Sequence, residues 1–314
     1  MNTPLDHTWV TEKPEIGELF PPRENARDVN KGTFGHAVIL AGSRDCVGAP
    51  ILVAEAATRV GAGLVTLVVP EAIEQVMMSR ISPVVLTRKL TQDPNGNYKI
   101  SVLDEALDLA KNATAVIFGP GIGLGEDIGL FARAFISRCP VSLVIDADAL
   151  TLLSREPDRG ESIIRGRTAP TILTPHPGEM GRLLGIKTEQ VQEERESSVN
   201  KAVSIYESVV VLKGARTLIG GQYDKLSANA NGNPGMATGG TGDVLSGVIV
   251  GLLAQGLAPL SAATVGVFIH GLAGDLAATD QGGFTGLIAT DLISYLPRAI
   301  AKCQMKVDGS CLPT

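Results

Sequence analysis

The sequence predicts an α/β protein: a three-layer α/β/α sandwich around a mostly parallel central sheet. Short apolar runs rich in β-branched residues alternate with longer helix-like segments, which is typical of parallel sheets covered by helices. The runs are apolar at nearly every position, as in strands buried on both faces. The 36 glycines, beside only 4% aromatic residues, fit many tight turns between strands and helices.

The elements follow in order from the points where glycine, proline or polar clusters break the apolar runs. Strands are predicted at 37–41, 64–70, 84–90, 115–118, 142–145, 171–173, 209–213 and 217–219, and a polar, hairpin-like segment follows. Helices are predicted at 49–61, 71–79, 103–111, 127–137, after 179, at 189–206, from 240 onward, at 261–278 and at 289–301. Asn95-Gly96 predicts a surface turn.

The chain is predicted to hold a single domain, because 314 residues with 44% hydrophobic content can bury one large core. Residues 1–30 are rich in proline and charge without periodicity, and we expect them to form an arm or a docking segment. The domain is placed at 31–303 and a polar tail at 304–314. The sequence shows no repeat and no linker after residue 30, so we expect no separate lid domain.

Composition and charge exclude several classes of partner. A net charge of −6 argues against a nucleic-acid or anionic-membrane surface. The longest apolar run, 244–258, is too short to span a bilayer, and the N-terminus shows no secretion signal. We expect a reducing cytoplasm, because neither C-x-x-C nor zinc spacing joins the four cysteines, Cys46, Cys139, Cys303 and Cys311.

A glycine-rich turn is the strongest sign of a catalytic site. Three glycines surround a threonine, and a carboxylate and an apolar helix follow: Gly239, Gly240, Thr241, Gly242 and Asp243. The backbone N–H groups of such a turn can converge on an anion, and the helix dipole adds to them. Because a carboxylate would repel a phosphate, we interpret Asp243 as a general base for a hydroxyl that meets that phosphate. The alternative is an ordinary N-cap aspartate.

Other phosphate-binding and catalytic motifs are absent from the sequence. No G-x-x-x-x-G-K-[ST] occurs, and 119–123 lacks the third glycine of a dinucleotide fingerprint. His36, His176 and His270 stand singly, without metal-ligand spacing, and no G-x-S-x-G marks a nucleophilic serine. The unusual motifs follow predicted strands, and ligands of such sheets sit beyond the carboxyl ends of the strands. The glycine turn is therefore the one motif that fits phosphoryl transfer.

The glycine turn and several companion motifs resemble one enzyme family. The turn alone looks like the anion hole of the ribokinase-like superfamily. The whole set, across about residues 30–300, resembles the ADP- or ATP-dependent NAD(P)H-hydrate dehydratases: Lys31-Gly-Thr-Phe-Gly-His36, Gly61-Ala-Gly-Leu-Val-Thr66, Gly119-Pro-Gly121, Asp146-Ala-Asp-Ala-Leu150, Thr174-Pro-His-Pro-Gly-Glu179, Leu212-Lys-Gly214 and the segment 233–247. Asn30 departs from the family's usual histidine and Ala41 from its glycine, and neither change removes a group that the chemistry needs.

The resemblance implies a lyase of nicotinamide nucleotide repair. Its substrate would be the S-epimer of NADH or NADPH hydrate, whose tetrahydropyridine ring carries a hydroxyl on C6. Hydroxide leaves poorly at neutral pH, so phosphorylation by ADP or ATP and elimination of phosphate would restore NADH or NADPH. Asp243 would take the hydroxyl proton, and the N–H groups from Gly239 to Gly242 would hold the transferred charge. Mg²⁺ would bridge the nucleotide phosphates.

The resemblance also assigns binding residues one at a time. Besides Asp243, substrate contacts are expected from Ala49, Gly121 and His176. The nucleotide is expected at Lys213, Gly214, Ala215, Arg216 and Thr217, with Gly242 on the phosphate side. Asn233 and Asp146 are second candidates, for contacts to phosphate or to metal-bound water.

Several of these residues have a structural alternative. His176 alone fits a hydrogen-bonded loop histidine, and Lys213 alone fits a solvated strand end. Asp146 and Asp148 would serve equally as caps of a helix that begins near residue 149. His270 lies in an apolar helical stretch and is interpreted as structural.

Two other functions remain open from the sequence. A ribokinase-like kinase of a small alcohol, such as a vitamin precursor, would share the base and the anion hole, and a non-catalytic nucleotide-binding module would keep the fold alone. The donor, ADP or ATP, is undecided, and we expect ADP because bacterial-type family members generally use it and no leader is visible. Family habit also predicts a homo-oligomer, such as a tetramer, and a functional pairing with an NAD(P)H-hydrate epimerase.

Overall fold

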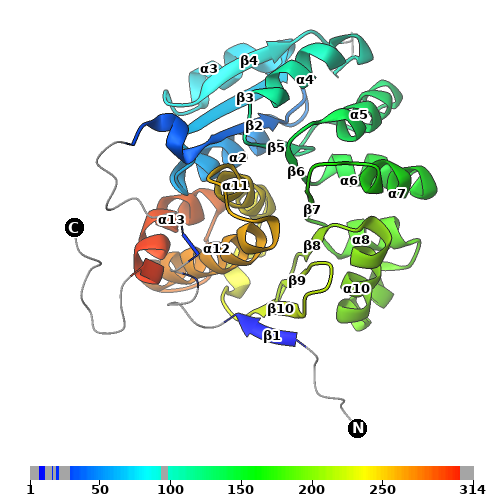
Figure 1. Cartoon of the computed structure of the whole chain (residues 1–314). Helices are drawn as coiled ribbons and strands as arrows, with labels where there is room; N and C mark the ends of the chain where they lie inside the picture. The colour runs from blue at the N-terminus through cyan, green and yellow to red at the C-terminus, as the bar shows by residue number, and fades with distance from the viewer. Residues whose placement is uncertain (1–6, 11–15, 17–18, 21–28, 93–97, 305–314) are drawn as a thin grey trace.

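A single mixed sheet forms the centre of the protein in a computed structural model that describes residues 7–10, 16, 19–20, 29–92 and 98–304 (Figure 1). Ten strands follow the order β1-β10-β9-β8-β7-β6-β5-β2-β3-β4. Their bounds are β1 His7–Val10, β2 His36–Leu40, β3 Leu64–Pro70, β4 Leu86–Leu90, β5 Ala115–Phe118, β6 Ser142–Ile145, β7 Thr171–Leu173, β8 Val209–Leu212, β9 Leu218–Gly220 and β10 Leu226–Asn229. Only β9 runs antiparallel to its neighbours, so the predicted mostly parallel sheet is confirmed.

Successive residues of the central strands feed two separate hydrophobic cores. In β2, Ala37 and Ile39 join one cluster of buried side chains and Val38 and Leu40 join the other, because side chains alternate between the faces of a strand. Both faces of the sheet are therefore covered, which explains why the strand sequences are apolar at nearly every position.

One face of the sheet carries the helices that begin and end the described chain (Figure 1). These are α2 Gly48–Arg59, α3 Glu74–Arg80, α11 Thr241–Ala254, α12 Pro259–Gln281 and α13 Ala289–Gln304. Helix α12 is long and apolar enough to cross a membrane, but 78% of its most apolar window is buried inside the molecule. It is accordingly a core helix of this layer, packed beside α11 and α13.

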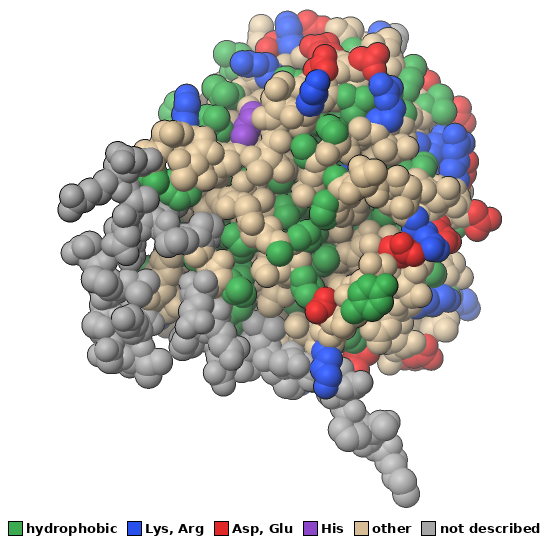
Figure 2. Space-filling model, viewed as in Figure 1, with side chains coloured by type: hydrophobic (Ala, Val, Ile, Leu, Met, Phe, Trp, Pro, Cys, Tyr) green, Lys and Arg blue, Asp and Glu red, His purple; other side chains and the backbone are tan. Residues whose placement is uncertain are grey.

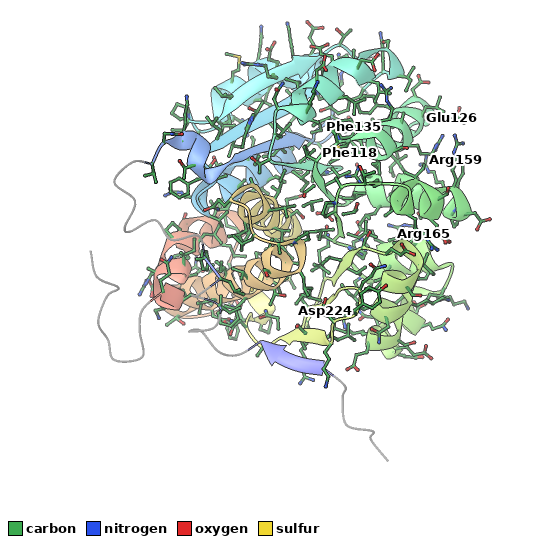
Figure 3. All side chains as sticks on the ribbon, viewed as in Figure 1. Phe118, Glu126, Phe135, Arg159, Arg165 and Asp224 are labelled. Atoms are coloured by element: carbon green, nitrogen blue, oxygen red, sulfur yellow. The ribbon has the colours of Figure 1, made fainter. Side chains whose placement is uncertain are left out.

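The helices of the middle of the chain cover the opposite face. They are α4 Leu103–Lys111, α5 Glu126–Arg138, α6 Asp148–Ser154, α7 Pro157–Arg165, α8 Pro177–Leu184, α9 Thr188–Glu193 and α10 Arg195–Tyr206. Figure 3 shows Phe118 of β5 and Phe135 of α5 side by side, with ring centroids 5.1 Å apart. Acidic and basic side chains are interleaved over the outer surface in the view of Figure 2.

The structure differs from the predicted elements in four places. Strand β1 pairs in parallel with β10, although the sequence around it shows no periodicity. Helix α7 was not predicted, because its sequence is polar and it buries only Gly160 and Ile164. The predicted helix 189–206 divides into α9 and α10 at Glu194, whose backbone leaves the helical region (φ −123°, ψ 48°). The predicted helix 71–79 begins as a short 3₁₀ turn, Glu71–Ile73.

Three further 3₁₀ turns complete the described chain: Lys31–Phe34, Ile100–Val102 and Pro234–Met236. The predicted surface turn at residues 95–96 and the predicted tail 304–314, apart from Gln304, lie outside the described residues.

Candidate active site

The glycine turn opens helix α11 at the centre of the molecule. Gly240 is the N-cap, with a left-handed backbone (φ 89°), and a Cβ at this position would lie 2.5 Å from Cδ1 of Leu52. The left-handed backbone favours glycine, and a larger side chain would also have to displace the end of the Leu52 side chain of α2. The first turn of the helix consists of Thr241, Gly242 and Asp243, whose N–H groups have no partner within the helix. They form a cradle for an anion.

Two side chains hold this first turn in place. The Thr241 hydroxyl lies 3.0 Å from the carbonyl oxygens of Met236 and Thr238. Nε2 of His270 lies 2.9 Å from the Thr241 carbonyl oxygen. Burial lowers the pKa of His270 to about 4, so the ring is neutral and its Nε2–H donates to that carbonyl. His270 belongs to α12, so this contact ties the anion cradle to that helix. The contact agrees with the interpretation of His270 as a structural residue.

Asp243 points a free carboxylate into the site. It is the third residue of α11 and not its N-cap, so the ordinary-cap alternative is wrong. It makes no hydrogen bond or ion pair with any residue that the structure describes. Burial, and then the negative charges of Asp146 and Asp148, raise the pKa of Asp243 to about 7, against the opposing effect of Lys213. A carboxyl poised near neutral pH is suited to general base catalysis.

A buried cluster of charges lies behind the cradle. Lys213 Nζ is 2.6 Å from Oδ1 of Asp146 and 3.8 Å from Oε2 of Glu179, and the Ser246 hydroxyl donates to the other oxygen of Asp146. Only 1% of the Asp146 side chain is exposed. Burial lowers the pKa of Lys213, but the charges of Asp146 and Glu179 together outweigh it and raise that pKa. The lysine therefore stays an ammonium.

This cluster decides two alternatives left open by the sequence. Lys213 is not a solvated strand end, since its side chain is only 16% exposed and its Nζ would lie 3.6 Å from a Cβ at Gly242. Asp146 is not a helix cap, because α6 has Ala147 as its N-cap and no side-chain cap. Both residues are committed to the charge cluster, which joins the ends of β6 and β8 to α11.

His176 caps helix α8 at the edge of the same cluster. Its Nδ1 accepts hydrogen bonds from the N–H groups of Gly178 and Glu179, and its Nε2 lies 3.4 Å from Oε1 of Glu179. Burial and the nearby charge of Lys213 lower the pKa of His176, so the ring is neutral and carries its proton on Nε2. About half of the side chain is exposed, which leaves the ring accessible to a ligand.

The predicted substrate contacts Gly121, in the loop after β5, and Ala49, in the first turn of α2, lie together. A Cβ at Gly121 would lie 3.6 Å from the Ala49 Cβ and 2.5 Å from Sγ of Cys46. The Gly42 N–H donates to the Pro120 carbonyl at 2.8 Å, which joins the two loops. Cys46 was not predicted, and it packs directly against Gly121.

Alanine at position 121 is expected to destabilise the protein more than alanine at position 185. Both glycines have φ of 65°, but a Cβ at Gly185 would meet nothing within 4 Å. The backbone conformation alone costs about 1–2 kcal/mol, so Gly185→Ala measures that effect. The collision with Cys46 should add about 1–3 kcal/mol in Gly121→Ala. If urea titrations show that Gly121→Ala and Gly185→Ala lose the same free energy of unfolding, the Cys46 loop moves aside with no cost in free energy.

A pocket of about 590 Å³ opens beside the cradle, within the usual range for small-molecule sites. The predicted nucleotide residues all line it: Lys213, Gly214, Ala215, Arg216, Thr217 and Gly242. Arg195, which was not predicted, holds their loop by donating to the carbonyls of Leu212 and Lys213. Asn233 also lines the pocket, but its side chain accepts from the Gly235 N–H and donates to Asp275, so it shapes the loop.

Two of the unpredicted residues left a signal in the sequence. Ser246 is a polar residue inside an otherwise apolar helix run, three positions after Asp243, and it faces Asp146. Glu179 ends the Thr174-Pro-His-Pro-Gly-Glu179 motif and is buried. Arg195 left none, because the loop that it holds is bound through the backbone carbonyls of Leu212 and Lys213.

Known proteins are similar to this chain in sequence. The family described as NAD(P)H-hydrate dehydratase matches residues 37–298. An ADP-dependent (S)-NAD(P)H-hydrate dehydratase of Neisseria meningitidis is 36% identical over 273 residues, or 86% of either chain. A bifunctional NAD(P)H-hydrate repair enzyme of Coxiella burnetii is 41% identical over 92% of this chain but only 54% of its own length, so the chain spans about half of such relatives.

A solved structure extends the likeness to three dimensions. The ADP/ATP-dependent NAD(P)H-hydrate dehydratase from Bacillus subtilis, co-crystallized with ATP/Mg²⁺, has a TM-score of 0.78 and 28% identity, covering 94% of this chain and 98% of its own. A hydroxyethylthiazole kinase from Pyrococcus horikoshii, at 17% identity and a TM-score of 0.58, shares the fold alone. With the family match covering most of the domain, the chain belongs to the NAD(P)H-hydrate dehydratase family.

Proposed function

We propose that this protein dehydrates the S-epimer of NADH or NADPH hydrate, with ADP or ATP as phosphoryl donor. The observation that carries the proposal is the carboxylate of Asp243, which has no partner among the described residues and lies in an anion cradle beside a nucleotide-sized pocket. A base next to a phosphate cradle is what phosphoryl transfer to a hydroxyl requires. The names of the relatives support the nicotinamide hydrate as substrate.

Phosphoryl transfer would come first. The C6 hydroxyl oxygen attacks the terminal phosphorus of the nucleotide, the bond from that phosphorus to the bridging oxygen breaks, and Asp243 takes the hydroxyl proton. The N–H groups of Thr241, Gly242 and Asp243 would hold the charge on the transferred group, with the helix dipole behind them. This cradle spans residues 241–243, so it begins two residues later than the predicted one, which spanned residues 239–242.

Elimination would follow from the phosphorylated hydrate. The lone pair of the ring nitrogen expels phosphate from C6, and the C6–O bond electrons leave with the phosphate. A proton is then lost from C5, and its bonding electrons form the C5=C6 double bond of the reduced nicotinamide. The ammonium of Lys213, close beneath Gly242, would attract the phosphates of both nucleotide and intermediate.

A magnesium ion fits this site as a companion of the nucleotide. The described part of the chain holds no group of three or more His, Cys, Asp or Glu side chains able to ligate a metal. Asp146 is already occupied by Lys213 and Ser246. Phosphate oxygens and water would therefore supply most of the ligands, as Mg²⁺ prefers. The ion would neutralise charge on the transferring phosphoryl group.

The test of the function is recovery of reduced-nicotinamide absorbance when S-hydrate, ADP or ATP and Mg²⁺ are mixed with the protein. One equivalent each of nucleotide product and phosphate should accompany each NADH. A small-alcohol kinase would instead leave a phosphorylated product and no such absorbance, and a non-catalytic module would consume no nucleotide. Parallel reactions with ADP and ATP settle the donor, for which we propose ADP.

Turnover is expected to rise with pH through about 7. A general base acts only after losing its proton, and burial holds the pKa of Asp243 near that value, so kcat should fall below neutral pH and level off above it. A kcat profile measured from about pH 5 to pH 9 tests this. Burial also raises the pKa of Glu179 to about 7. The acidic limb should therefore persist in Glu179→Gln, and its disappearance there would reassign the limb to Glu179.

The wider setting of the enzyme is also a proposal. The bifunctional repair enzymes among the relatives support a functional pairing with an NAD(P)H-hydrate epimerase. We further infer a cytoplasmic homo-oligomer, such as a tetramer, with the catalytic domain at residues 31–303 between an N-terminal arm and a short tail.

A further inference from the structure

The proposed reaction removes two protons from the substrate, one from the hydroxyl and one from C5. Asp243 holds the first after phosphoryl transfer, and it has no hydrogen-bond partner among the described residues through which to pass it on. A second acceptor beside the ring would let elimination proceed without waiting for Asp243 to lose its proton to water. This inference rests on the proposed function and concerns which residue takes the second proton.

Asp148 is a second carboxylate at the same end of the sheet. It is the first residue of α6, directly after β6, and is half-buried. Its Oδ2 accepts a hydrogen bond from the Gly123 N–H at 2.9 Å, which holds it against the loop that carries Gly121. Its other oxygen has no partner in the described part of the chain. One oxygen is thus anchored and the other is available.

The backbone separates Asp148 from its neighbour Asp146. Ala147 between them has φ 54° and ψ −120°, a conformation that costs a non-glycine residue about 1–3 kcal/mol and that is concentrated at functional sites. As a result, Asp146 faces Lys213 and Ser246, whereas Asp148 faces the Gly123 loop. Two aspartates two positions apart therefore enter different environments.

Asp148 and Asp243 lie within electrostatic range of the same thiol. Both of their charges act on the Cys46 thiol, which packs against Gly121. Burial and the charge of Asp146 raise the pKa of Asp148, which makes it a stronger base than an exposed aspartate. Burial also raises the pKa of the Cys46 thiol, so this neighbour stays protonated at neutral pH and is a poor acceptor.

We propose that Asp148 is a second base of this site, which accepts the C5 proton during elimination while Asp243 holds the proton from the hydroxyl. The C5–H bond electrons become the C5=C6 double bond, the ring cation is neutralised, and phosphate leaves with the C6–O electrons. The proton on Asp148 passes to water when the products leave. Asp148 is therefore a catalytic residue for elimination and not for phosphoryl transfer.

The test compares Asp148→Asn with Asp148→Ala in a single turnover, using S-hydrate that carries deuterium on one face of C5. Asparagine keeps an oxygen for the Gly123 N–H but accepts no proton, and alanine loses both. Quenched samples report nucleotide product for the first step, and absorbance reports NADH for the second. Mass spectrometry of the NADH reports which C5 hydrogen was removed.

The wild-type protein should remove one C5 hydrogen stereospecifically. In Asp148→Asn the nucleotide product should still form in the first turnover, but NADH should appear about 10²-fold or more slowly, with deuterium partly kept and partly lost as water becomes the acceptor. Asp148→Ala should show the same loss. The exposed Asp158→Asn, on the neighbouring helix α7, is the matched control and should match wild type.

Three other results would each overturn the assignment. If Asp148→Asn resembles wild type and only Asp148→Ala is impaired, Asp148 merely tethers the Gly123 loop. If nucleotide product and NADH slow equally, or if stereospecificity survives in Asp148→Asn, another group takes the C5 proton. A wild-type protein that forms no NADH would refute the proposed function itself, and the assignment with it.

Discussion

Replacing Asp243 with asparagine is expected to lower kcat about 10²–10⁴-fold, the contribution that a positioned general base typically makes. The amide keeps the shape of the side chain but cannot take the hydroxyl proton. Because the carboxylate has no partner among the described residues, the substitution removes no contact, and the free energy of unfolding should change by less than about 1 kcal/mol. Absorbance of NADH and quenched assays of nucleotide product should fall together.

A matched control separates this effect from the general loss of a first-turn carboxylate. Asp127 lies in the first turn of α5 and is exposed, so Asp127→Asn alters the same helix-dipole interaction far from the pocket. It should turn over like the wild type. Turnover of Asp243→Asn within about threefold of wild type would mean that another group is the base of the first step.

The elements that the sequence predicts well are those whose burial is complete. Strands β2, β3, β5 and β6 are buried on both faces by local apolar runs, and their position follows from composition alone. Strand β1 is different, because four residues at a sheet edge become a strand only through their pairing with β10, more than two hundred residues away. The sequence of β1 alone does not indicate that it pairs with so distant a strand.

The features of the site also divide into those that the local sequence predicts and those that only the fold brings about. The glycine turn, Asp243 and the 213–217 loop were predicted, and Thr241, Gly242 and the 213–217 loop line one pocket. The ion pair between Asp146 and Lys213 spans 67 positions and forms because β6, β7 and β8 are neighbours in the sheet. Spacing along the chain does not reveal that order. The sequence therefore predicted Asp146 and Lys213 as separate candidates and not as an ion pair.

Replacing Lys213 with methionine is expected to destabilise the protein by about 3–5 kcal/mol, because it leaves a buried carboxylate without its counter-charge. Asp146 is almost fully buried and Glu179 is 6% exposed, so water cannot replace the ammonium. Methionine approximates the apolar length of lysine, which limits the loss of packing. Urea titration gives the free energy of unfolding, and Lys201→Met, at an exposed position of α10, is the control and should change it by less than about 0.5 kcal/mol.

The double variant Lys213→Met/Asp146→Asn distinguishes a stranded charge from a lost packing contact. Removing both partners of a buried ion pair costs much less than removing one, so the double variant should regain a large part of the stability, whereas a packing defect would persist. Lys213 also lowers the pKa of Asp243. The acidic limb of the kcat profile should therefore move to higher pH in Lys213→Met, because Asp243 then holds its proton more tightly. If the protein loses stability but the acidic limb does not move, Lys213 has only a structural role. The pKa of Asp243 would then not depend on the charge of Lys213.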